Sequence, residues 1–439
     1  MIPVNDVIDF DEKAAEKLKE MQEQPTGPKP GTLAALPFSR TKDKDPKIKA
    51  NSLMNIELIL DNDPELKDTF RFNEFTSEIE VVKDSPKLHI AKGQLLDRYV
   101  DEIASYIERA VDYDHVLFNS DRIRSAISVI ASKHAFNPVK DYFDAAEKAW
   151  DGDDRLHNVF SDYLGVEKTP ATDLIADIWF RGAVAKAYNP MVKFDFVLDL
   201  VGGQGAGKTT FLQKIAPLGY YTDQFLSFTD KDDFAVMRRS LIVNDDELTA
   251  TSNSSFEELK KFVTLQMFEY RKPYGHTAER FPKNFVMART TNELYYLKDK
   301  TGERRFLPIH VSKAAQKFHP VTDLTAEYVQ QLWGQVVSDY RKNRSFYLPE
   351  EAEAILNEQR ENFMYTDEVE DQIEMMLDSA FKDRTFVTAS EIALQMGVSD
   401  LTTNRKLANQ IANVMINRFG WRKGRGYLPD GRRMRGYVK

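Results

Sequence analysis

The sequence predicts an α/β fold whose parallel sheet lies between a helical domain and a compact basic domain. Residues 191–345 alternate short apolar strands with helices, which is the pattern of an α/β core. Apolar residues at helical spacing precede this region, and two helices and a hairpin are expected after it. We therefore divide the chain into five parts: an N-terminal helix with a Pro/Lys-rich linker (1–50), a mainly helical domain (51–190), the α/β core (191–345), a helical connector (346–384) and a basic C-terminal domain (385–439).

The helical domain is predicted from apolar residues that recur three and four positions apart. Val100, Ile103 and Ile107 fall on one face of an expected helix, and Ile123 and Ile127 repeat the pattern in the next. A small strand pair is expected at about residues 70–82. This domain precedes the region that carries the chemical motifs.

Composition excludes several classes of protein. The 439 residues include no cysteine, so disulfides and thiolate metal sites are excluded, and the seven histidines lack the spacing of a zinc site. No apolar stretch is long enough to cross a bilayer, and the first residues lack the pattern of a signal peptide. We expect a cytoplasmic protein without a membrane partner.

The charge of the chain is unevenly distributed. Residues 401–439 contain ten Lys and Arg against one acid, Asp430, although the whole chain carries a net charge of −9. A basic end on an acidic body favours a polyanionic partner for that end.

A glycine-rich loop lies between an expected strand at 194–201 and an expected helix at 209–215. The pattern G-x-x-x-x-G-K-T between a strand and a helix predicts a P-loop, whose backbone N–H groups surround a phosphate chain. We expect Lys208 to contact the β- and γ-phosphates of ATP and the Thr209 hydroxyl to bind Mg²⁺. The expected nucleotide-binding residues are Gly202, Gly203, Gln204, Gly205, Ala206, Gly207, Lys208, Thr209 and Thr210.

A second apolar strand, at 240–248, ends in three consecutive acids. Such a strand can place one carboxylate near the metal and another near the attacking water. We assign Asp246 to the metal and Glu247 to the general base. Asp245 remains the alternative metal partner, because neighbours along a strand point to opposite faces.

Polar residues after a third strand complete the predicted site. Residues 285–292 read as a strand that ends in Thr-Thr-Asn, and AAA+ ATPases carry a polar residue, usually Asn, at this place to sense the γ-phosphate. Asn292 fits that role. Arg304 and Arg305 follow a Gly-containing turn, and either guanidinium could stabilise the transferring phosphoryl group of a neighbouring subunit.

With these motifs in this order, the chain resembles the virulence-associated protein E family, which are phage and mobile-element helicases akin to superfamily 3. The resemblance covers roughly residues 51–360, and it rests on the P-loop, the acidic strand and the following further segments: 136–142, 150–156, 193–195, 231–232, 271–275 and 290–292. Family members often carry an acid where this chain has Asn244, which shifts the expected metal-side carboxylate to Asp245 or Asp246.

The resemblance implies an AAA+ core that assembles into a homo-hexameric ring and moves on single-stranded DNA. It also implies a hairpin before the third strand that projects into the central channel. Residues 268–281 fit that hairpin, and Lys272, Tyr274 and His276 near its tip combine cations with an aromatic ring, as sites that track single strands do. An ordinary surface hairpin is the alternative.

The basic C-terminal domain resembles a winged helix. Thr388 and Glu391 form an expected capping box, a second helix follows Thr402 or Thr403, and a hairpin turns at residues 429–431. Such modules bind duplex DNA, although some dock proteins instead. The expected DNA-binding residues here are Arg405, Lys406, Arg422, Lys423, Arg425, Arg432 and Arg433.

Together these observations predict an ATP- and Mg²⁺-dependent DNA helicase of phage or mobile-element replication, with host replication proteins as further partners. The alternative is a non-motor regulator in which ATP only switches assembly on DNA. A packaging motor is disfavoured because no nuclease-like acidic cluster follows the core, and a primase because the chain lacks an aspartate-pair or zinc signature.

Overall fold

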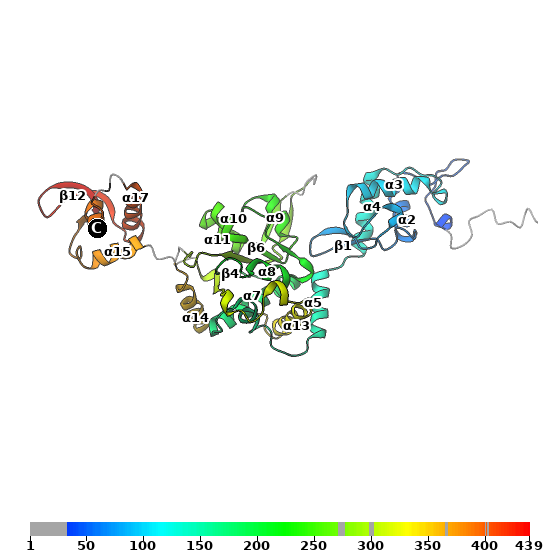
Figure 1. Cartoon of the computed structure of the whole chain (residues 1–439). Coiled ribbons are helices and arrows are strands. Elements are labelled where there is room, and N and C mark those ends of the chain that lie inside the picture. Colours follow the sequence, from blue (N-terminus) through cyan, green and yellow to red (C-terminus); the bar gives the residue numbers. More distant parts are fainter. Residues whose placement is uncertain (1–32, 271–276, 298–302, 365–367, 400, 402–403) are drawn as a thin grey trace, which may run out of the picture. The chain divides into compact units, whose positions relative to one another are not determined.

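The computed structural model describes residues 33–270, 277–297, 303–364, 368–399, 401 and 404–439 (Figure 1). Contacts divide the chain into two compact units, Met1–Ala149 with Arg238–Leu241, and Trp150–Met237 with Ile242–Lys439. None of the helices within the described ranges combines the length and apolarity that a bilayer crossing requires.

The first unit packs helices beside a small antiparallel sheet of order β1-β2-β3. The predicted strand pair is confirmed, with Phe70 opposite Val81. The elements are η2 (Leu33–Ala35), α2 (Leu53–Asn62), β1 (Phe70–Asn73), β2 (Glu78–Val81), η3 (Pro86–Leu88), β3 (Gly93–Gln94), α3 (Asp97–Arg109), η4 (Val111–Tyr113), α4 (Ser120–Lys133) and α5 (Pro138–Ala149).

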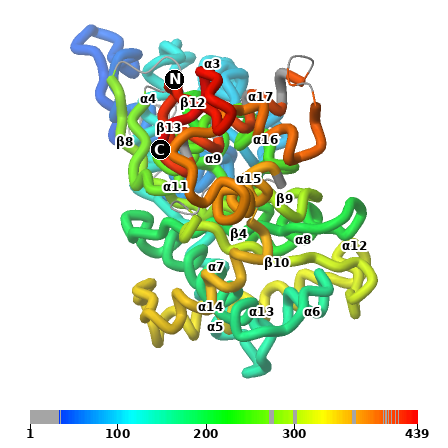
Figure 2. The backbone as a smooth tube through the Cα atoms, turned by 90° about the vertical axis from the view of Figure 1, so that its left-hand side faces the viewer, coloured from blue at the N-terminus to red at the C-terminus, as the bar shows by residue number. Residues whose placement is uncertain are grey.

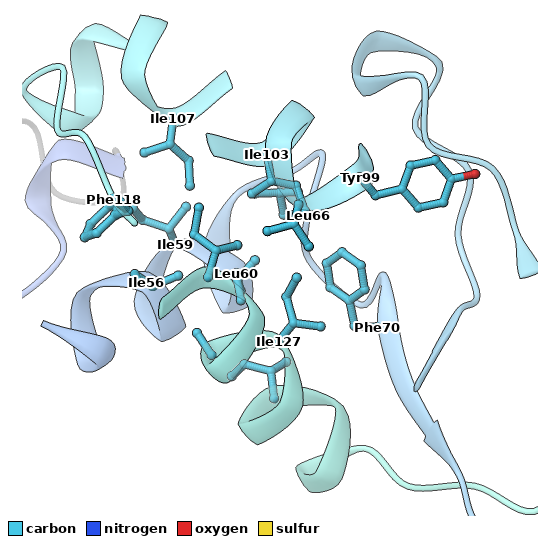
Figure 3. Packing of buried hydrophobic residues seen from close by; sticks show 14 of the residues in the cluster. Ile56, Ile59, Leu60, Leu66, Phe70, Tyr99, Ile103, Ile107, Phe118 and Ile127 are labelled. Carbon is cyan, nitrogen blue, oxygen red and sulfur yellow. The ribbon is translucent and has the colours of Figure 1, made fainter. Parts of the chain in front are cut away.

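The core of this unit confirms the predicted helical periodicity. Ile103 and Ile107 of α3 and Ile127 of α4 are fully buried, and they meet Ile56 and Ile59 of α2 (Figure 3). Asn119 begins α4, because its side chain accepts a hydrogen bond from the backbone N–H of Asp121.

The second unit contains a five-stranded parallel sheet of order β10-β4-β9-β6-β5, which confirms the predicted α/β class. Its strands are β4 (Val197–Val201), β5 (Tyr221–Thr222), β6 (Ile242–Asp245), β9 (Val286–Thr291) and β10 (Phe306–His310). The acidic strand ends at Asp245, earlier than expected, and the next three residues form a 3₁₀ turn, η6 (Asp246–Leu248).

Helices cover both faces of this sheet (Figure 1). On one face α7 (Pro170–Tyr188) contacts β4 and β9, and the indole N–H of Trp179 donates to the Met287 carbonyl at 2.8 Å. On the other face Phe262, Phe268 and Phe285 form an aromatic cluster. The remaining elements up to residue 364 are α6 (Val159–Leu164), α7 (Pro170–Tyr188), α8 (Lys208–Ile215), η5 (Pro217–Gly219), α9 (Lys231–Met237), α10 (Thr249–Asn253), α11 (Phe256–Thr264), β7 (Met267–Tyr270), β8 (Glu279–Pro282), η7 (Glu303–Arg305), η8 (Lys313–Ala315), α12 (Pro320–Asp323), α13 (Ala326–Lys342) and α14 (Glu350–Glu361).

The expected domain boundary at residue 190 does not coincide with the division between the units. Helices α6 and α7 belong to the second unit, since α7 packs on the sheet and on α13 and α14. Helix α7 is buried on nearly all sides, so its sequence does not show the one-sided pattern that marks a surface helix of the sheet.

The C-terminal part has its own core, which includes Ile392, Ile411, Met415 and Trp421. Thr388 and Glu391 form the predicted capping box. The second helix begins one residue later than expected, because the Asn404 side chain accepts the N–H of Leu407. The elements are α15 (Glu368–Asp378), β11 (Phe386–Val387), α16 (Ala389–Gln395), α17 (Arg405–Asn413), η9 (Val414–Arg418), β12 (Arg422–Tyr427) and β13 (Arg433–Val438), and the sheet order is β11-β13-β12.

Candidate active site

The glycine-rich loop connects the end of β4 to the start of α8, as predicted. Gly205 and Gly207 adopt positive φ angles of 73° and 78°, which other L-residues rarely adopt. A Cβ atom on Gly202 would lie 2.2 Å from the Val311 carbonyl oxygen, so only glycine fits there. The glycines therefore allow both the curl of the loop and its close packing at the carboxyl edge of the sheet.

Lys208 lies inside this loop. The residue is 6% exposed, and its ammonium donates to the carbonyl oxygens of Gly202 and Gly203. Burial lowers the pKa of Lys208, whereas the negative charges of Glu247 and Asp246 act in the opposite direction. The loop thus holds one cation where the P-loop pattern requires it.

Asp246 is the acid that meets the loop. Its Oδ1 accepts hydrogen bonds from the Thr209 hydroxyl at 2.7 Å and from the Thr290 hydroxyl at 2.8 Å. The Asn244 amide donates to the same oxygen at 3.2 Å. The Asn244 amide therefore stabilises the Asp246 carboxylate with a hydrogen bond.

Asp245 points the other way. Its carboxylate accepts from the backbone N–H groups of Ala250 at 2.8 Å and Thr251 at 3.0 Å, which belong to the first turn of α10. Burial raises the pKa of Asp245, while these hydrogen bonds and the charge of Arg289 oppose the rise. Of the two metal partners proposed from the sequence, only Asp246 lies beside Thr209.

Glu247 follows Asp246 in a left-handed backbone conformation, with φ 51°. Its N–H donates to the Thr290 hydroxyl at 3.0 Å, and its side chain is exposed. Such a conformation costs about 1–3 kcal/mol and is found mainly where the surroundings impose it, often at functional sites. The turn thereby directs Glu247 away from the strand and into the neighbourhood of Lys208, whose pKa its charge affects.

The third strand contributes Thr290 as well as the predicted Asn292. Asn292 follows β9 at the same sheet edge and is exposed. The Thr290 hydroxyl donates to the Asp246 carboxylate and accepts from the Glu247 N–H, a role that the sequence did not predict. The period of two along a strand was the available signal, because it places Thr290 and Asn292 on one face.

These groups fit a magnesium nucleotide. Among the described residues no three His, Cys, Asp or Glu side chains gather into a metal site of their own. Mg²⁺ usually takes only one or two protein ligands and completes its octahedron with water and phosphate oxygens. The Thr209 hydroxyl and the Asp246 carboxylate, 2.7 Å apart, are a donor set of that kind.

Arg304 and Arg305 lie at the amino ends of the strands, whereas the glycine-rich loop lies at the carboxyl ends. They precede β10, whose Phe306 pairs with Val197 at the start of β4, whereas the loop follows the other end of β4. Five residues of strand separate the two edges by about 16 Å. Arg304 is exposed and Arg305 half-buried, and both line a pocket of about 470 Å³ with Lys193, Arg344 and Tyr347.

A family model describes the region that contains this site. The virulence-associated protein E-like domain matches residues 145–365, half of the chain, which include the loop, the acidic turn and both arginines. The chain belongs to this family. The expected similarity upstream, from residue 51, lies outside the matched residues.

Two solved structures are among those similar to this chain. The apo structure of the NrS-1 C-terminal region is 12% identical with a TM-score of 0.36, covering 84% of this chain and 95% of that one. A second structure of that region, in its A form, is 11% identical with a TM-score of 0.36, at 84% and 96% coverage. The comparison with curated proteins finds no significant relative.

The hairpin that the sequence predicts before the third strand is formed by β7 and β8. The two strands pair in antiparallel fashion, with Phe268 opposite Phe281, so the hairpin exists as expected. Lys272, Tyr274 and His276, the DNA-binding residues expected in this segment, lie outside the described residues.

The C-terminal hairpin, formed by β12 and β13, lies outside the residues that the family model matches. Its cations are distributed over two faces. Arg425 pairs with Arg435, so these two side chains share a face. Lys423 and Arg433 each lie two residues along a strand from one of them, and alternation puts them on that face too. Lys423, Arg425 and Arg435 line a pocket of about 440 Å³. Arg435 was not among the predicted residues, although alternation along the hairpin would have placed it with them.

The other predicted cations of this domain are arranged differently. Arg422 pairs with Val438 on the opposite face, and Arg432 forms an ion pair with Asp430 at 2.6 Å. The side chains of Arg405 and Lys406 lie outside the described ones.

Proposed function

We propose that this chain is an ATP-hydrolysing ring motor that acts on DNA, an AAA+-type helicase of phage or mobile-element replication. The observation that carries the proposal is the separation of Arg304 from Lys208 across the sheet. It is supported by the P-loop geometry, the Asp246–Thr209 pair and the family to which the chain belongs.

The loop and its neighbours divide the work of hydrolysis. Lys208 and the loop N–H groups hold the phosphate chain, and Thr209 and Asp246 hold the metal. Bound Mg²⁺ would neutralise charge on the phosphate oxygens. Glu247 accepts a proton from the attacking water as the new bond to the terminal phosphorus forms and the bond to the bridging oxygen breaks.

Arg304 and Arg305 lie away from the nucleotide loop of their own subunit. Arg304 lies about 16 Å away along the strands, which is farther than an arginine side chain reaches. An exposed arginine at the opposite edge can instead enter the site of a neighbouring copy in a head-to-tail ring. This arrangement makes hydrolysis depend on assembly, as the hexamer implied by the family resemblance requires.

DNA contacts are proposed at two places. The β7–β8 hairpin would contact single-stranded DNA in the channel, and residues 385–439, as a winged-helix-like domain, would bind duplex DNA at an origin. The cationic face of the C-terminal hairpin supports the second assignment, since phosphate contacts supply most nonspecific affinity.

A subunit-mixing experiment tests the proposal. We expect Lys208→Ala and Arg304→Gln each to abolish ATP turnover, which is measured with and without single-stranded DNA. Mixing the two inactive proteins should restore turnover, because about a quarter of interfaces in a random head-to-tail ring combine an intact Lys208 with an intact Arg304.

The mixture has a built-in control. Lys208→Ala mixed with a chain that carries both substitutions should remain inactive, since no interface then has both groups intact. Persistent inactivity of the first mixture would contradict the shared site, and turnover that single-stranded DNA does not stimulate would favour the ATP-switched regulator.

A further inference from the structure

The segment after β10, residues 311–320, runs along the whole glycine-rich loop. At its start the Val311 N–H donates to the Val201 carbonyl at 2.7 Å, and the Val311 carbonyl faces Gly202. At its end Pro320 packs on Gly207, where a Cβ would lie 3.0 Å from the proline ring. Residues 311–320 therefore form a wall along one side of the loop.

Side-chain and backbone hydrogen bonds hold this wall in place. The Gln316 amide donates to the Ala206 carbonyl at 2.7 Å. On its other side the Ser312 N–H donates to the Leu164 carbonyl at 3.0 Å, and Lys317 pairs with Asp162 at 2.6 Å. The α12 helix continues from this segment beside α8 (Figure 2), and Lys214 of α8 donates to the Leu324 carbonyl.

Lys313 is the cation that this wall presents to the loop. Its side chain is exposed, and its Nζ lies 3.9 Å from the position that a Cβ on Gly205 would occupy. Gly205 is in the middle of the loop, between the segments whose N–H groups surround a phosphate chain. Lys317, four residues along, has its charge paired with Asp162 instead.

We propose that Lys313 is a second phosphate-binding cation of this site, which contacts the phosphate chain of the nucleotide bound by its own subunit. The proposal rests on the function proposed above and adds a residue to it. Lys208 holds the phosphate chain from inside the loop, and Lys313 holds it from the wall. An ammonium on a flexible stem suits this task, because it can follow a phosphate without a fixed geometry.

Equilibrium titration with a fluorescent ATP analogue tests the inference on the full chain. We expect Lys313→Gln to weaken binding about tenfold, the effect of losing one charge-assisted hydrogen bond. Lys313→Arg should restore most of the affinity because it keeps the charge. Lys342→Gln is the matched control, an exposed lysine at the end of α13 that pairs with Asp339 outside the wall, and should bind the analogue like wild type.

Steady-state turnover gives a second readout. Lys313→Gln should raise the KM for ATP with little change in kcat, since the lost contact serves binding more than the chemical step. Wild-type affinity and KM in Lys313→Gln would overturn the inference while leaving the proposed function intact. A wild-type chain that binds no ATP would instead overturn the proposed function, and this inference with it.

Discussion

Asp245 and Asp246 are chemically identical neighbours with different surroundings. Asp245 accepts hydrogen bonds from the first turn of α10, and Asp246 accepts them from Thr209 and Thr290. The strand ends between them, so that one carboxylate stabilises the fold and the other faces the nucleotide loop.

This difference predicts opposite effects of two conservative substitutions. Asp246→Asn should lower kcat at least about 100-fold, because an amide cannot replace a metal-side carboxylate. Asp245→Asn should instead lower the unfolding free energy by about 1–3 kcal/mol, because an amide has one acceptor oxygen for several donors. Turnover assays and urea unfolding of both variants check this, and equal losses of kcat would contradict it.

Lys283 is a fully buried lysine whose charge the fold disfavours. Its ammonium donates to the Val263 carbonyl at 2.8 Å, and burial, assisted by the charge of Lys186, lowers its pKa to about 7. Between pH 7 and 10 the unfolded chain therefore binds more protons than the folded one. The contribution of Lys283 to stability is smallest below pH 7 and increases as the pH rises towards 10.

The corresponding test compares wild type with Lys283→Met. We expect the unfolding free energy of wild type to gain up to about 1.4 kcal/mol per pH unit from this group in that range. The variant should lack this gain. The unfolding free energy of wild type minus that of the variant, measured by urea unfolding, should therefore increase from pH 6 to 10. Parallel curves would show that Lys283 keeps an ordinary pKa.

At the scale of elements, the β12–β13 hairpin separates its two faces by residue type. Glycines occupy one face because the Phe386 ring lies against it: a Cβ on Gly426 would be 2.3 Å from that ring. The other face carries Lys423, Arg425 and Arg435. Alternation along paired strands therefore concentrates charge on the face without glycines.

Two charge-matched double variants follow from this arrangement. Arg425→Gln with Arg435→Gln should weaken duplex DNA binding and reduce the salt slope of the affinity by about two ions, because both side chains lie on the cationic face. Arg422→Gln with Arg432→Gln removes the same charge from the other face and the turn, and should have a much smaller effect. Fluorescence anisotropy at several salt concentrations distinguishes them, and equal losses would contradict the face assignment.

On the scale of the whole molecule, β10 lies between two proposed functional residues. Arg304 precedes the strand, and the segment that presents Lys313 follows it. The strand thus has the arginine proposed for a neighbour at one end and the wall of its own nucleotide loop at the other. The strand is an edge strand that pairs along its whole length with β4, the strand that leads into the glycine-rich loop.

Local patterns were sufficient for several parts of the fold and site. The G-x-x-x-x-G-K-T loop, the capping box at Thr388 and the hairpin turn at residue 430 depend on near neighbours in the chain, so their residue types predict their geometry. The buried α7 was harder to place, because a helix covered on nearly all sides loses its amphipathic signal, and its contacts group it with the second unit.

The sequence by itself therefore determined the α/β class, the glycine-rich loop, and which acids and arginines are candidates for the site. Only the tertiary structure decided that Asp246 rather than Asp245 meets Thr209, that Thr290 joins the acids, and that Lys313 lies beside Gly205. The physical reason is that strand ends and turns decide side-chain direction, and parallel strands bring residues as distant in sequence as Gly205 and Lys313 to one edge.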